Sequence, residues 1–91
     1  MEGAISKIMN ATPANAAPIL ARAIRVEEQA LVIVMADSGR EVAVHWAATS
    51  PALKAATFSQ RSRATLSPGG YGIHWPDVDE DLAIGALIRG A

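Results

Sequence analysis

Between residues 19 and 46 the hydrophobic and polar positions predict an antiparallel sheet of three strands. The middle segment, 31–35, holds five consecutive large apolar residues, which is typical of a central strand covered on both faces. A turn at 27–29 precedes it, and a hairpin turn with Gly39 follows it. We expect the flanking strands at 19–26 and 41–46, with the inner face of the third formed by Val42, Val44 and Trp46.

The second half of the chain alternates between helix and strand patterns. A hydroxyl residue, Thr49 or Ser50, followed by Pro51 predicts the start of a short helix. Extended segments are expected at 61–66 and 71–75, with a turn at 67–70 between them. A final helix is expected at 79–89, and its buried stripe would consist of Leu82, Ile84, Leu87 and Ile88. The predicted fold class is α+β: a three-stranded meander, a short helix, a further strand pair and a C-terminal helix.

The first residues read as an arm that precedes this domain. Ile5, Ile8 and Met9 have the spacing of a short amphipathic helix, and Pro13 and Pro18 then interrupt the helical pattern. We therefore predict a helical arm with a linker at 1–18 and one α+β domain at 19–91.

Composition and charge narrow the class of protein. The chain of 91 residues is one small domain without cysteine, so its core has no disulfide to support it and self-association is expected to help. The net charge is −1, with seven basic and five acidic residues in 1–63 (+2) and one basic and four acidic residues in 64–91 (−3). This balance argues against a nucleic-acid binder. The absence of a signal peptide pattern or a long apolar run predicts a cytoplasmic protein and no membrane partner.

An acidic run beside a histidine is the main candidate for chemistry. His74 with Asp77, Asp79 or Asp81 could serve a metal-assisted hydrolase. The run does not fit a calcium loop, however, because Leu82 stands where that loop needs glycine. We favour an interpretation in which the carboxylates cap the final helix and the histidine is structural. No catalytic residue, metal ligand or cofactor is therefore assigned.

A small basic cluster gives a second alternative. Lys54, Arg61 and Arg63 lie close together in the sequence, with Phe58 as the nearby aromatic residue. Such a cluster could contact phosphate, which would make the chain a nucleic-acid-binding regulator. A solvated face is the favoured interpretation.

One stretch resembles a known family. The run from Gly70 to Leu82, together with Pro51, Leu53, Arg61, Leu87 and Gly90, is similar to the bacterial domain-of-unknown-function family 2442 (DUF2442) from about residue 24 to residue 90. The chain departs from the family pattern in a hairpin turn one residue longer, at 37–40, and in His45, where a proline is common. What we call the signature comprises Gly70, Tyr71, Gly72, Ile73, His74, Trp75, Pro76, Asp77, Asp79, Glu80 and Asp81.

The resemblance implies a small α+β domain with no assigned activity or cofactor. It also implies that the gene neighbours a second small gene, and that this chain is the antitoxin-like member of the pair. Together with the missing catalytic set, it leads to the hypothesis of a non-enzymatic interaction or regulatory module. We expect the chain to associate with itself and to bind a small partner protein encoded nearby, through the arm or through an exposed edge strand.

Overall fold

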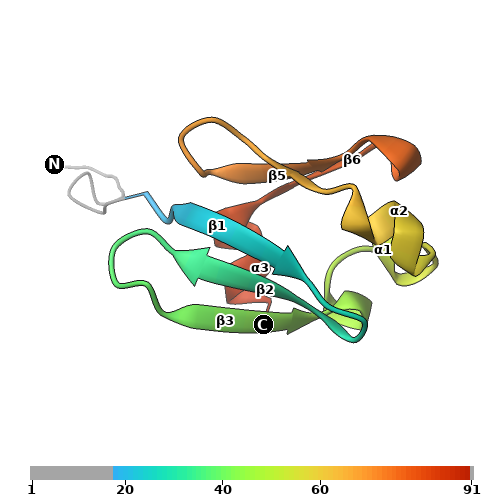
Figure 1. Ribbon diagram of the computed structural model, residues 1–91, viewed down its shortest axis with the longest axis horizontal. Helices are drawn as coiled ribbons and strands as arrows, with labels where there is room; N and C mark the ends of the chain where they lie inside the picture. Colours follow the sequence, from blue (N-terminus) through green and yellow to red (C-terminus); the bar gives the residue numbers. More distant parts are fainter. Residues whose placement is uncertain (1–17, 91) are drawn as a thin grey trace, which may run out of the picture.

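The computed structural model describes residues 18–90 as two antiparallel sheets joined by short helices (Figure 1). The first sheet has the strand order β1-β2-β3, formed by β1 (Ala21–Val26), β2 (Ala30–Met35) and β3 (Glu41–His45). The second has the order β4-β5-β6, formed by β4 (Thr65–Leu66), β5 (Gly72–Trp75) and β6 (Glu80–Ala83). The α+β class and the three-stranded meander are confirmed, and the predicted helical arm lies outside the described residues.

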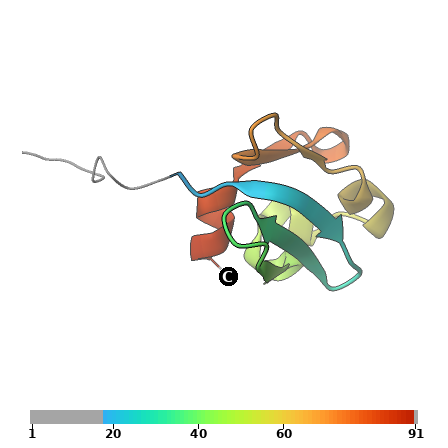
Figure 2. The ribbon, with the colours of Figure 1, turned by 60° about the vertical axis from the view of Figure 1, so that its left-hand side comes forward.

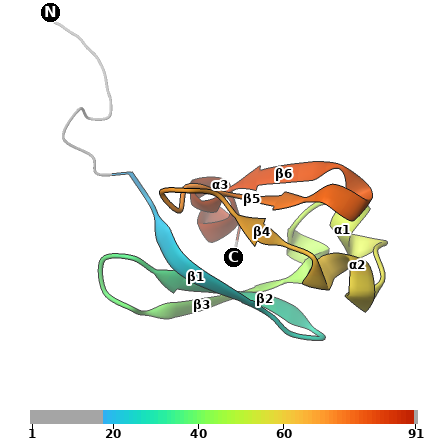
Figure 3. The same ribbon diagram turned by 45° about the horizontal axis from the view of Figure 1, so that its top comes forward.

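The helical segments lie at the ends of the two sheets. They are η1 (Trp46–Ala48), α1 (Pro51–Lys54), α2 (Phe58–Ser62), η2 (Pro76–Val78) and α3 (Ile84–Arg89). The sheets form two layers, with α1 and α2 together at one end (Figure 3). Helix α3 lies nearer the other end, close to the start of β1 (Figure 2). As predicted, Ser50 begins the first helix, because its hydroxyl accepts a hydrogen bond from the Leu53 amide at 3.2 Å.

Both sheets and two of the helices contribute to one core. Two tryptophans join the layers: the Trp46 and Trp75 rings meet edge to face, with centroids 6.4 Å apart. Each indole N–H has a backbone acceptor, the Glu27 carbonyl for Trp46 and the Arg61 carbonyl for Trp75. The other large buried side chains are Leu31, Ile33, Met35, Val44, Leu53, Ile73, Ile84 and Leu87.

The central strand is buried on both faces, as predicted, but its two faces are covered differently. Its inner face packs in the core, and on the outer face Val32 is only 5% exposed. Arg25 lies opposite Val32, and its guanidinium donates to both carboxylate oxygens of Glu41 on β3, at 3.1 and 3.3 Å. The Arg25 side chain therefore crosses β2. These hydrogen bonds also hold the pKa of the Glu41 carboxyl below its ordinary value.

The final helix is shorter than predicted. Residues 80–83 form β6, so α3 begins only at Ile84. The reason is a chain reversal at Asp79, whose left-handed backbone (φ 52°) turns the following residues back along β5. Leu82 consequently lies opposite Ile73 in a strand, and the predicted strand pair is a trio.

The predicted strand at 61–66 is also mostly wrong. Thr57 and Gln60 form a capping box, in which each side chain accepts a hydrogen bond from the backbone N–H of the other residue. This arrangement starts α2 at Phe58, and only Thr65 and Leu66 remain as β4.

Candidate functional site

The signature forms the hairpin of β5 and β6, and its alternation divides it between two faces. Ile73 and Trp75 are buried beneath the sheet, whereas His74 between them is exposed on the other side. The prediction that His74 and Trp75 face opposite sides is confirmed. The inward residues build the core, which leaves the outward residues as candidates for a function.

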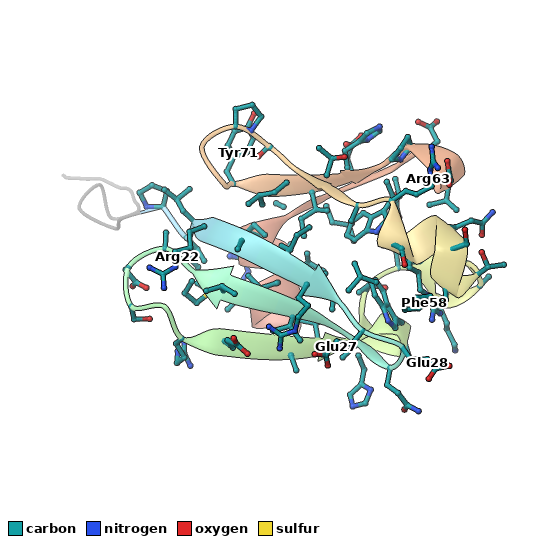
Figure 4. All side chains as sticks on the ribbon, in the orientation of Figure 1. Arg22, Glu27, Glu28, Phe58, Arg63 and Tyr71 are labelled. Atoms are coloured by element: carbon teal, nitrogen blue, oxygen red, sulfur yellow. The ribbon has the colours of Figure 1, made fainter. Side chains whose placement is uncertain are left out.

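The outward residues surround a hollow on the outer face of the second sheet. It has a volume of about 360 Å³ and is mostly apolar, with Ser67, Tyr71, Gly72, His74, Asp81 and Ala83 among its lining residues. The Tyr71 ring is 63% exposed and stands on the loop that leads into β5, at the border of the molecule (Figure 4). We call this surface the signature face and define it by Ser67, Tyr71, His74, Asp81 and Ala83.

A hydrogen-bonded pair crosses the signature face. His74 and Asp81 are register partners on β5 and β6, and Nδ1 of the imidazole lies 2.7 Å from the Asp81 carboxylate. With a proton on Nδ1, the imidazole donates this hydrogen bond to the carboxylate. Both side chains are exposed to solvent, so the pair is accessible to another molecule.

Of the three acidic residues predicted to share a metal with His74, the structure brings Asp81 to the imidazole, whereas Asp77 and Asp79 are engaged elsewhere. The Asp77 carboxylate binds Nε of Arg63 at 3.0 Å, and Asp79 occupies the left-handed turn after η2. Within residues 18–90, no three side chains of the histidine, cysteine, aspartate or glutamate type are grouped closely enough to hold a metal. The predicted capping role is wrong as well, because α3 begins at Ile84 and its N-cap residue, Ala83, has no side-chain group to accept a hydrogen bond.

The first residue of the signature has a structural task. Gly70 has a left-handed backbone (φ +77°), and its carbonyl accepts a hydrogen bond from the Ala21 amide at 2.7 Å. A Cβ on Gly70 would lie 1.9 Å from the Ala21 carbonyl oxygen. Through this contact, the turn at Gly70 connects the second sheet to the start of β1.

The predicted basic patch is largely engaged within the chain. The Arg61 guanidinium donates to the carbonyls of Leu53 and Lys54, both at 2.9 Å, and lies 5.0 Å from the Trp46 ring centroid. Arg63 pairs with Asp77. Sequence reasoning missed the role of Arg61 because its acceptors are backbone groups, which leave no pattern in the side chains.

The described residues thus form an α+β fold of two layers, with an open, mostly apolar hollow beside the exposed Tyr71 on the second sheet. Residues 21–91 match the family model described as a protein of unknown function, DUF2442, and the chain belongs to this family. The same fold is seen in the crystal structure of a protein of unknown function from Rhodospirillum rubrum, with 22% identity and a TM-score of 0.71. That alignment covers 81% of this chain and 89% of the other.

A second similar structure is the solution structure of an uncharacterised protein from Chromobacterium violaceum, with 25% identity and a TM-score of 0.64. Here 78% of this chain is covered, and the chain spans 65% of that protein. A comparison with curated proteins finds no match. In the part of the chain that the structure describes, no helix is long and apolar enough to cross a membrane.

Proposed function

We propose that the chain is a non-enzymatic interaction module that binds a partner protein through the signature face. The observation that supports this proposal is the exposed Tyr71 ring beside an open, mostly apolar hollow. Exposed aromatic side chains next to apolar depressions are typical of the centres of protein interfaces. Tyr71 is not among the residues of the core, so we expect its ring to contribute little to folding.

Charge indicates what kind of partner segment fits. Among the residues that line the hollow, Asp81 on β6 supplies a carboxylate. We infer a segment that places an apolar side chain in the hollow and a neighbouring arginine or lysine against Asp81, within reach of the Tyr71 ring.

The test compares two exposed aromatic residues. Tagged chain is purified from its native host as the wild type, as Tyr71→Ala and as the matched control Phe58→Ala, because Phe58 is 49% exposed at the opposite end of the molecule (Figure 4). We expect a stoichiometric second protein with the wild type and the control, and its loss with Tyr71→Ala. Both variants should keep the wild-type melting temperature. Retention by Tyr71→Ala, or the absence of any second protein, would contradict the proposal.

In its finer form, the proposal makes the partner the product of a neighbouring gene, as in an antitoxin-like pair. Co-expression of the two gene products with the same three forms of the chain tests this identity. The nucleic-acid alternative is less well supported, since Arg61 and Arg63 bind groups of their own chain. The hydrolase alternative is also less well supported, since Asp77 pairs with Arg63 and, within residues 18–90, Asp81 and His74 have no third ligand-type side chain grouped with them.

A further inference from the structure

Strand β3 is one of the two edges of the first sheet, and β1 is the other. Among the described elements only β2 pairs with it, and it lies at the border of the molecule (Figure 1). The Met35 amide donates to the Arg40 carbonyl, and the register continues with Ile33 opposite Val42. In an antiparallel ladder such bonded pairs alternate, so every second residue of β3, namely Glu41, Ala43 and His45, directs its N–H and C=O away from the sheet.

The other edges are less suited to adding a strand. The start of β1 is occupied, because the Ala21 amide donates to Gly70. Strand β4 has two residues, and β6 carries Glu80 and Asp81, so that a second copy would bring carboxylates together. Charges and short strands of this kind protect edges from pairing.

The sequence of β3, Glu-Val-Ala-Val-His, is complementary to itself when it is read in the opposite direction. With Ala43 facing Ala43 of a second copy, Glu41 lies opposite His45 of that copy, and the reverse pair forms by symmetry. An imidazole N–H can donate to the carboxylate, which retains free lone pairs beyond those that Arg25 uses. On the inner face, the half-buried Val42 would occupy the register position opposite Val44 of the second copy, whose side chain is already fully buried in its own core.

We propose that two copies of this chain pair antiparallel through β3, with the two-fold axis at Ala43, and so form one continuous six-stranded sheet. The small Ala43 side chain allows the strands to approach, and the two Glu41–His45 pairs fix the register. This surface lies on the first sheet and the signature face on the second, so the failure of either proposal leaves the other standing.

The first test measures the mass of the full chain by sedimentation equilibrium, between about 10 µM and 1 mM. The wild type should approach twice the 9.5 kDa of one chain. Ala43→Lys places two ammonium groups face to face at the axis and should raise the dissociation constant at least about tenfold. The matched control is Ala23→Lys, which is exposed on the same face of the sheet at β1 and should dimerise like the wild type.

The second test checks the register. His45→Glu sets two carboxylates opposite each other twice per dimer and should weaken it about tenfold, whereas the exchange Glu41→His with His45→Glu restores the opposite pairs and the dimer. A monomeric wild type at all concentrations would overturn the proposal. So would a dimer that survives Ala43→Lys, or one that is lost with Ile8→Asp but not with Ala43→Lys, which would assign the contact to the N-terminal arm.

Discussion

Substituting alanine for Gly70 should destabilise this domain far more than the same change one residue earlier. Gly69 and Gly70 both have left-handed backbones, with φ of +88° and +77°. They differ in what surrounds them: a Cβ on Gly69 would have the Tyr71 ring at 3.7 Å as its nearest neighbour, whereas a Cβ on Gly70 would overlap the Ala21 carbonyl at 1.9 Å.

The two costs can be separated. Both substitutions place an alanine in the left-handed region, which lowers the free energy of unfolding by about 1–2 kcal/mol. Only Gly70→Ala must also push β1 away from the turn, which adds an overpacking cost of about 1–3 kcal/mol. It also breaks the hydrogen bond from the Ala21 amide, worth about 1 kcal/mol. We therefore expect a loss of about 3–6 kcal/mol for Gly70→Ala and about 1–2 kcal/mol for Gly69→Ala.

Urea unfolding followed by tryptophan fluorescence measures both values, because Trp46 and Trp75 lie in the shared core. A loss of a few kcal/mol is a large part of the stability of so small a domain, so Gly70→Ala is expected to be partly or fully unfolded without denaturant. Equal losses for the two variants would refute the reasoning, since they would show that the contact between the turn and β1 contributes nothing.

Three further predictions test other contacts of the fold. Arg61→Ala removes two hydrogen bonds to backbone carbonyls and the contact with a tryptophan ring, and should cost about 1–3 kcal/mol in urea unfolding, whereas Arg63→Ala, whose side chain is 66% exposed, should cost at most about 1 kcal/mol. Equal costs would contradict the structural role of Arg61. Thr57→Ala removes half of the capping box and should lower the free energy of unfolding by about 1 kcal/mol; no change would show that α2 does not depend on its cap. The folded state holds the pKa of Glu41 below its unfolded value, so this group stabilises the fold above the unfolded pKa, and that stability is lost as pH falls through the folded pKa. Glu41→Gln should therefore lose stability at neutral pH and flatten the acid limb of the stability curve measured by thermal unfolding; an unchanged acid limb would contradict the pairing with Arg25.

The alternating pattern predicted the first sheet because, in its strands, the apolar positions of the sequence are the positions that the fold buries. Val42 and Val44 face inward as the pattern requires, and the hairpin turn has its glycine, Gly39, in the left-handed region. The second half was harder to predict. The acidic run from Asp77 has the composition of a helix start, yet the left-handed Asp79 turns it into a hairpin. A tertiary pairing between Ile73 and Leu82 overrides the local preference.

The candidate site could be predicted only in part. The sequence places His74 and Trp75 on opposite faces, which is enough to divide the signature into core and surface. It does not reveal that Asp81 is the partner of His74, because that pairing depends on the register of β5 and β6. The structural task of Gly70 was equally hidden, since its neighbour Ala21 lies far away in the sequence.

The central claim is that the outward residues of the signature form the recognition surface. The most direct measurement is a pair of ¹H–¹⁵N spectra of the labelled chain, recorded alone and with the captured partner. We predict that the largest shifts in the amide resonances cluster at Tyr71, Gly72, His74, Asp81 and Ala83, around the hollow. Shifts that cluster on α2 near Phe58, or along β3 with the hollow unchanged, would contradict it.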